Sequence, residues 1–151
     1  MGEKSKSAST TIAAPPATVF AILADPRQHA RIDGSGTVKK SVSGPDRLEL
    51  GSRFGMDMKM GSKYKITNKV VEFEADKLIA WRHLGTHRWR YELAPSADGG
   101  TTVTETWDLA HCNPVLRAVL RSMFGARTQD ALDATMVKLK DAAESDVIRP
   151  T

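Results

Sequence analysis

The residue best suited to acid–base chemistry is a glutamate set among aromatic residues. Glu105 alternates with Val103 and Trp107, so these three side chains share one face of a predicted strand. A carboxyl group desolvated on an apolar face has a raised pKa, which suits a general acid or base. Glu105 is therefore a candidate catalytic residue. The alternative is a structural hydrogen bond to Tyr91 or a salt bridge to a basic side chain.

Tyr91 and two histidines are the polar residues expected on the same face. One hairpin would place Tyr91 opposite Glu105, and a second would place His83 opposite His87. In a catalytic protein, Glu105 would move protons while Tyr91 or His83 orients a carbonyl group. The alternative is that both histidines are partly exposed hairpin residues. No metal site is expected, because only two imidazoles converge and no third ligand is evident.

Three segments with alternating aromatic residues predict the strands that carry these groups, at 78–84, 87–93 and 102–108. Turns centred on Gly85 and Asp98 would join them into antiparallel hairpins. The shared face then holds all three tryptophans of the chain, Trp81, Trp89 and Trp107. Such a surface is more typical of the wall of a ligand cavity than of a plain core.

Three further strands are expected at 37–42, 52–59 and 63–74, with a bulge near Val70. The side chains of these strands that face inward, together with apolar side chains of the last helix, complete a predicted ligand-binding surface. Its members are Phe54, Met56, Met58, Tyr64, Ile66, Asn68, Trp81, Trp89, Trp107, Leu120, Phe124 and Met136. The methionines would form an adaptable wall, with ordinary core packing as the alternative. Asn68 would either orient a polar ligand group or satisfy backbone at the bulge.

The remaining segments predict an α+β architecture. A first strand is expected at 10–13, a helix after Pro15-Pro16 and a short helix at 26–32. From Pro114, apolar residues at helical spacing predict one helix of about 30 residues. A curved antiparallel sheet of about seven strands, with this helix against its concave face, would bury the apolar side of every predicted strand and helix. A pocket between helix and sheet follows.

Bulk composition narrows the class of protein. The 151 residues suit one domain, predicted at 9–147, with tails at 1–8 and 148–151. A net charge of +4 is too modest to indicate nucleic-acid binding, and no cofactor motif is present. The single cysteine excludes an intrachain disulfide, and no signal peptide is apparent, so a cytoplasmic protein is expected.

The first half of the long helix is basic as well as apolar, with Arg117, Arg121 and Arg127 among leucines and valines. Such a segment can touch an anionic membrane, but it is more often a packed helix with a solvated basic edge. Gly125 would either let the helix bend or allow close packing against the sheet. The expected partner is a hydrophobic small molecule, and the expected assembly is a monomer or a homodimer.

Three stretches resemble the START-like superfamily, and within it the bacterial polyketide cyclase/dehydratase group. They are the opening 12–16 followed by 19–26, the paired strands 89–93 and 103–107 joined through 99–101, and the helical 139–144. The resemblance implies a helix-grip fold, and the absence of cofactor motifs predicts that no cofactor is used. Relatives bind lipids, polyketides, plant hormones and other hydrophobic molecules, and some act as cyclases or aromatases.

Three functions follow as hypotheses. The first is binding of a lipid, aromatic or polyketide-like molecule, with possible cyclase or dehydratase chemistry at Glu105. The second is a non-catalytic lipid carrier or sensor, in which Trp89 would matter more than Glu105. The third is a protein-interaction module of the chaperone-activator type, which would need a filled pocket and an exposed apolar patch.

Overall fold

The computed structural model describes residues 5–35, 38–82 and 87–148. In chain order, its elements are β1 (Ser5–Ile12), α1 (Pro16–Leu23), a 3₁₀ turn η1 (Pro26–Gln28), α2 (His29–Ile32), β2 (Val38–Ser43), β3 (Arg53–Met60), β4 (Ser62–Glu74), β5 (Leu78–Arg82), β6 (Arg88–Pro95), β7 (Thr101–Asp108) and α3 (Pro114–Ile148).

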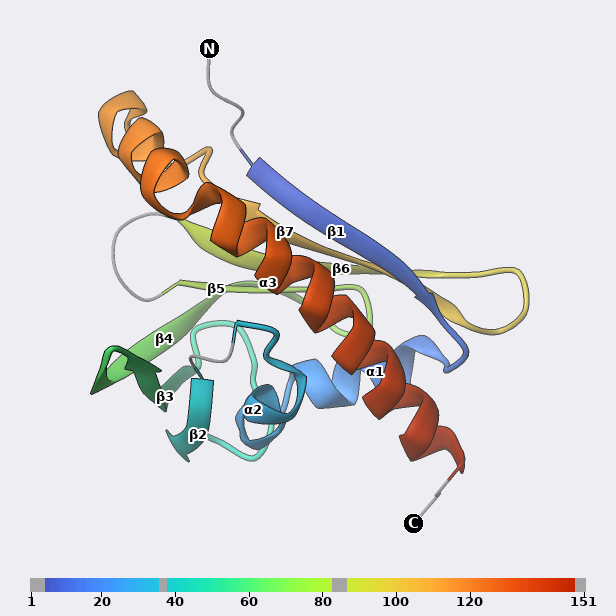
Figure 1. Ribbon diagram of the computed structural model, residues 1–151. Helices are drawn as coiled ribbons and strands as arrows, with labels where there is room; N and C mark the ends of the chain where they lie inside the picture. The colour runs from blue at the N-terminus through green and yellow to red at the C-terminus, as the bar shows by residue number, and fades with distance from the viewer. Residues whose placement is uncertain (1–4, 36–37, 83–86, 149–151) are drawn as a thin grey trace.

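The seven strands form one antiparallel sheet in the order β1-β7-β6-β5-β4-β3-β2. Strands β2 to β7 are sequential neighbours, while β1 pairs with β7 at the far edge. The helix α3 lies across the sheet, and α1 and α2 sit beside its C-terminal part (Figure 1). The predicted fold class, a curved antiparallel sheet with one long helix, is confirmed.

The strand register agrees with the predicted hairpins. Tyr91 pairs with Glu105, and Trp89 pairs with both Trp81 and Trp107. The turns between β3 and β4 and between β6 and β7 contain glycines with φ of 76°, a conformation that residues with a Cβ rarely adopt. A register shift between Val70 and Glu72 confirms the bulge in β4. The predicted pairing of His83 with His87 is not tested, because His83 lies outside the described residues.

The beginning of the domain differs from the prediction. Strand β1 starts at Ser5 rather than at residue 10, so residues 5–8 belong to the sheet and not to a tail. The strand consists mostly of Ser, Thr and Lys, and its side chains are exposed or half-buried up to Ile12. It therefore lacks the apolar alternation from which the other strands were predicted. The expected helix at 26–32 is a 3₁₀ turn followed by one α-helical turn.

The main hydrophobic core lies under the C-terminal part of α3. Fully buried Phe20 and Leu23 of α1 meet Val70, Ile79 and Leu139 there. Glu144 of α3 accepts a hydrogen bond from the Ala13 backbone N–H at 2.8 Å, which ties the helix to the end of β1.

The helix α3 begins at Pro114, where Asn113 caps it by accepting a hydrogen bond from Leu116 N–H at 2.8 Å. Further along, Gly125 is buried against Lys6 of β1, and an added Cβ would lie 3.1 Å from the Lys6 Cε. Close packing against the sheet is thus the role that its surroundings support. Within the described residues, no helix is long and apolar enough to span a membrane.

Candidate functional site

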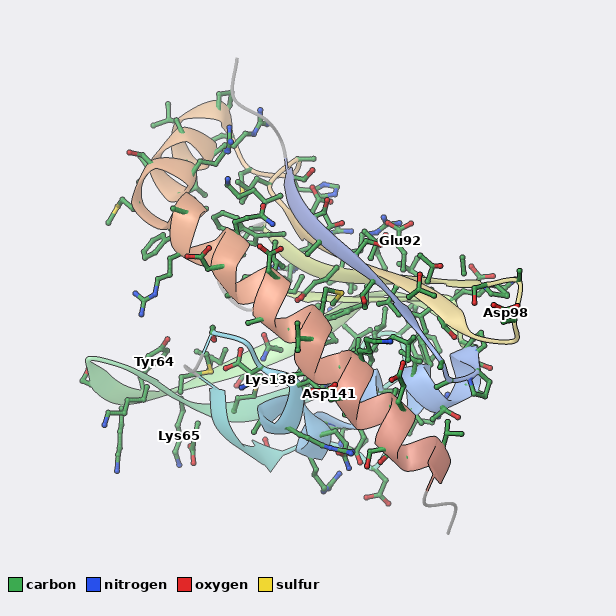
Figure 2. All side chains as sticks on the ribbon, turned by 45° about the vertical axis from the view of Figure 1, so that its right-hand side comes forward. Tyr64, Lys65, Glu92, Asp98, Lys138 and Asp141 are labelled. Atoms are coloured by element: carbon green, nitrogen blue, oxygen red, sulfur yellow. The ribbon has the colours of Figure 1, made fainter. Side chains whose placement is uncertain are left out.

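A cavity of about 500 Å³ lies between the sheet and the first two thirds of α3. Its walls come from α2 and the loop after it, from strands β3 to β7, and from one face of α3. Tyr64, which Figure 2 labels at the β3–β4 end of the sheet, lines the cavity and is 40% exposed. The volume suits a ligand of drug-like or lipid-headgroup size.

Most of the predicted ligand-binding residues line this cavity. They are Met56, Met58, Tyr64, Ile66, Asn68, Trp81, Trp89, Trp107, Leu120 and Phe124. Two do not: Phe54 and Met136 are buried in the core beneath the cavity. Phe54 supports the wall indirectly, because its ring packs edge-on against the rings of His29 and Trp81. The alternating pattern identified which side chains point inward, but not how deeply each of them lies in the protein. Whether the lining residues bind a ligand stays a prediction.

Glu105 is buried in the wall of the cavity, with 4% of its surface exposed. Desolvation is the main cause that raises its pKa from 4.5 to about 8, and the nearby carboxylate of Asp33 acts in the same direction. The Tyr91 hydroxyl donates a hydrogen bond to the Glu105 carboxyl, which acts in the opposite direction. Burial also raises the pKa of Tyr91 well above its ordinary value. At neutral pH, Glu105 is therefore mainly a neutral carboxylic acid that can deliver a proton.

The sequence did not identify His29 as a site residue. Its ring stacks on Trp81 with centroids 4.7 Å apart, and its Nε2 lies 2.8 Å from the Leu23 carbonyl oxygen. Burial lowers its pKa to about 4, so the ring is neutral near pH 7. Because His29 belongs to a single helical turn, no periodic pattern could have pointed to it.

Four buried polar atoms of the cavity wall have no hydrogen-bond partner within the described part of the chain. They are the Glu105 Oε1, the Trp107 Nε1, the Asn68 Oδ1 and the His29 Nδ1. Buried polar atoms are normally paired, and leaving one unpaired costs about 1–3 kcal/mol. All four atoms are buried within the wall itself, so the open volume of the cavity does not pair them.

His83 lies outside the described residues, so its predicted role is not assessed. His87 lines the cavity, and its ring meets the rings of Trp89 and Trp107 edge-on. Partial burial lowers its pKa. Among the residues that the structure describes, no group of three or more metal-ligating side chains converges.

The loop after α2 closes one side of the cavity by contacting α3. The Gly34 N–H donates to the Thr135 Oγ1 at 2.9 Å, and the Lys138 Nζ donates to the Asp33 carbonyl oxygen at 3.0 Å. A Cβ on Gly34 would lie 2.4 Å from backbone atoms of Ala131 and Thr135, so only glycine fits here. This contact brings the Asp33 carboxylate to the cavity, near Glu105.

Residues 5–144 match the family described as "Polyketide cyclase / dehydrase and lipid transport". The chain belongs to this family. The expected membership of the START-like superfamily is thereby confirmed, because the match spans nearly every element from β1 to the last turns of α3.

One relative with a similar sequence is the uncharacterized protein Rv0088 of Mycobacterium tuberculosis. It is 38% identical over 139 residues, which are 89% of this chain and 62% of the relative. The chain thus spans somewhat less than two thirds of the curated relative that it matches.

Solved structures share the fold at low sequence identity. Protein NE0264 from Nitrosomonas europaea has a TM-score of 0.72 at 17% identity, with 98% of this chain and 99% of that one covered. The Aha1 dimer from Colwellia psychrerythraea has a TM-score of 0.58 at 16% identity, covering 93% and 96%. At such identities these likenesses describe architecture alone.

Proposed function

We propose that this protein binds a hydrophobic small molecule, either aromatic, polyketide-like or lipid, in the cavity between the sheet and α3. One observation carries the proposal: a cavity of about 500 Å³ between the sheet and α3 is lined mainly by aromatic and apolar side chains. Apolar walls supply affinity, and a few fixed polar groups supply orientation. The family description, which names polyketides and lipids, supports the same class of ligand.

Native mass spectrometry of the freshly purified protein, followed by organic extraction, tests this proposal directly. A discrete hydrophobic adduct is the expected result, and its mass would give the ligand class. A matched control is Trp89→Ala, which removes an aromatic wall residue while sparing the fully buried core. A protein that is empty and also fails to bind a panel of lipids and aromatic polyketides would contradict the proposal.

We further propose that the cavity supports a dehydration in which Glu105 acts twice. As a neutral acid it would protonate the departing hydroxyl of a β-hydroxyketone as the C–O bond breaks, while its other carboxyl oxygen takes the proton from the carbon next to the carbonyl. The electrons of that C–H bond form the new C=C bond, so water leaves, the acid is restored and a conjugated ketone remains. The Tyr91 hydroxyl, already bonded to the carboxyl, would hold it in place throughout.

A suitable probe for this step is the β-hydroxyketone formed from benzaldehyde and acetone, whose dehydration product absorbs strongly in the ultraviolet. Turnover by the wild type, lost at least about a hundredfold in Glu105→Gln with probe binding kept, would support catalysis. Equal turnover in both proteins would remove Glu105 from the mechanism.

A carrier or sensor without chemistry is the second candidate, favoured by the same apolar lining. It predicts that an extracted ligand is recovered unchanged after incubation. Trp89→Ala would then weaken binding more than Glu105→Gln does. A cytoplasmic location and a monomeric or homodimeric state remain predictions. The dimer named for the Colwellia protein is a property of that protein.

A further inference from the structure

The outer face of the sheet, which points away from α3, is strongly basic at one end. Along β3 and the first part of β4, alternate residues such as Met58 and Tyr64 line the cavity, so their neighbours point outward. Figure 2 shows one of these neighbours, Lys65, on the side of the β3–β4 hairpin away from α3. We call the outward cations of β3, β4 and β5 the basic face, and they are Arg53, Lys59, Lys63, Lys65, Lys69 and Arg82.

The register of the strands brings like charges of the basic face directly opposite one another. Arg53, Lys69 and Arg82 form one row across three neighbouring strands. Lys59 and Lys63 pair in a second row. Cations that lie directly opposite each other in a sheet repel and destabilise it. The stability of the sheet therefore does not explain this arrangement.

The charges of the basic face are not balanced by carboxylates. Among the described residues, Asp57 is the carboxylate that points outward between the cations, and it lies opposite Lys65. None of the five cations on β3 and β4 forms an ion pair with a described residue. Six cations against one carboxylate leave a surplus larger than the net charge of +4 of the whole chain, so the positive charge is concentrated here.

The neighbouring part of the same outer face has the opposite character. Beyond the bulge in β4, Glu72 forms ion pairs with Arg88 at 3.1 Å and with Arg90 at 3.3 Å. Arg90 also pairs with Glu92 on its own strand. The cations of β6 are thus neutralised within the sheet, whereas those on β3 and β4 are not. This difference favours an anionic partner for the basic face.

The side chains of the basic face suit an extended anionic surface without fixed shape. Four of the six cations are lysines, whose charges sit on long flexible stems. The two rows span roughly 10 Å across the strands and lie roughly 20 Å apart along them. Gly55 and Thr67 pair between the rows, and no aromatic or large apolar side chain points outward at the described positions 53–59 and 63–69. Protein partners and single-stranded nucleic acids are generally held by such anchors.

The basic residues of α3 are less suited to such a surface. Arg117 and Arg121 are half-buried, and Arg117 donates hydrogen bonds to two backbone carbonyl oxygens just before the helix. From residue 130 onward, α3 carries five carboxylates and two lysines. The basic face and this part of α3 therefore carry opposite charge, which would orient the protein over an anionic surface.

We propose that the basic face docks the protein onto membranes rich in acidic phospholipids. Its lysine and arginine side chains contact the lipid phosphate groups, while α3 remains on the far side of the sheet. Each Lys or Arg held close to an anionic membrane strengthens binding by about fivefold, and salt screens the attraction. Neither the ligand of the cavity nor any reaction at Glu105 is needed for this docking, so it can fail while the proposed function holds, and the reverse.

Co-sedimentation of the full chain with lipid vesicles tests the docking. One set of vesicles contains phosphatidylcholine alone, and the other is an equal mixture of phosphatidylcholine and phosphatidylglycerol. In about 0.1 M salt, the wild type should bind the mixed vesicles at least about tenfold more tightly, and about 0.5 M salt should remove most of this binding. Equal binding to both sets, or binding that survives the higher salt, would overturn the proposal.

Two double variants locate the contact. Lys63→Gln with Lys69→Gln removes two cations that each lie opposite another cation. Binding to the mixed vesicles should weaken about ten- to thirtyfold, while the melting temperature should not fall, because repulsion is relieved. The matched control is Arg27→Gln with Lys77→Gln, which removes the same charge from cations that pair with carboxylates elsewhere. The control should bind within about twofold of the wild type.

Other anionic partners give distinct outcomes. Equal losses in both double variants would mean that total charge, rather than the basic face, drives adhesion, and the proposal would be wrong. It would also be wrong if the wild type ignored the mixed vesicles but bound polyglutamate or polyuridylate through Lys63 and Lys69, because the face would then serve an acidic protein or a nucleic acid. A wild type that binds none of these partners would overturn it as well. The salt dependence of the wild type tests the docking independently of how the variants fold.

Discussion

The two parts of α3 perform different tasks although they form one continuous helix. Beyond Thr135, apolar side chains such as Leu139 and Ala143 are fully buried against β1, α1 and the core. Before it, Leu120 and Phe124 are only half-buried over the cavity, and Val115 and Met123 are 75% and 68% exposed. The comparison shows that one part of the helix holds the fold together while the other covers the site.

The difference arises from what lies beneath each part. Under the C-terminal part, α1 and the inner face of the sheet fill the space, so each apolar contact stabilises the folded state. Under the N-terminal part lies a smaller buried cluster of Trp107, Leu109, Cys112 and Leu132. Leu120 and Phe124 pack against it but also face the cavity, so they gain less from folding than fully buried residues do. Substitutions in the two parts should therefore separate stability from ligand binding.

The largest effect is expected in the packed part. Leu139→Ala removes a fully buried side chain from the main core and should lower the free energy of unfolding by about 2–5 kcal/mol. Urea denaturation followed by circular dichroism measures the loss. Val137→Ala, at a position 61% exposed on the same helix, is the control and should change stability by less than about 0.5 kcal/mol. Similar losses in both variants would contradict a tightly packed C-terminal part.

A smaller effect is expected where the two parts of the helix meet. Gly34→Ala forces a methyl group against the backbone of Ala131 and Thr135, so the loop must move away from α3. Such overpacking costs about 1–3 kcal/mol. Because the loop also carries Asp33 to the cavity, the variant should weaken binding of pyrene, used as a fluorescent hydrophobic probe, as well. Unchanged stability and binding would mean that the loop tolerates displacement.

The third test uses pH to examine the cavity side. Glu105 keeps its proton in the folded protein up to about pH 8, whereas the unfolded chain releases it near pH 4.5. Between these values the Glu105 carboxyl binds fewer protons in the unfolded state, so its contribution to stability falls as the pH rises, by up to about 1.4 kcal/mol per pH unit. Glu105→Gln lacks this loss and should become the more stable protein towards pH 8.

Comparing the wild type with Glu105→Gln separates the pH effect of Glu105 from that of the neighbouring titratable groups. His29, whose pKa is lowered to about 4, makes folding more favourable as the pH rises from 4 to 6.5, but it does so in both proteins. Tyr91 and Asp33, which also face Glu105, are likewise present in both. Parallel stability curves from pH 4 to 9 would show that the Glu105 carboxyl is solvated rather than desolvated.

The smallest change in stability is expected at Leu120, the counterpart of Leu139 over the cavity. Leu120→Ala removes a half-buried side chain and should cost only about 1 kcal/mol or less. The same substitution should weaken binding of the hydrophobic probe pyrene several-fold, because Leu120 forms part of the wall. If Leu120→Ala destabilised the protein as much as Leu139→Ala does, the division of α3 into two parts would be wrong.

The sequence predicted the sheet well because its signals are local. Alternation and turn glycines set the register that pairs Tyr91 with Glu105, and the phase of Glu105 alone predicted its burial. Depth within the cavity is a tertiary property. Phe54 and Met56 are in the same phase, yet only Met56 reaches the cavity, because the ring of Phe54 is covered by His29 and Trp81.

Residues from irregular segments could not be predicted from alternation and turn signals. His29 and Asp33 come from one helical turn and the loop after it, and their position depends on contact with α3 and the sheet. A short turn carries no periodicity from which an inward face can be inferred. The only local hint was Gly34, whose closeness to α3 becomes evident once the helix is in place.

The strand β1 protects the most chemically important strand of the sheet. Its residues from Ser5 onward pair with the whole of β7, and Ala8 lies directly opposite Glu105. A version of the protein shortened to begin at residue 9 would uncover half of the β7 edge. Unpaired strand edges recruit other chains, so such a protein would tend to aggregate through the very strand that carries Glu105 and Trp107.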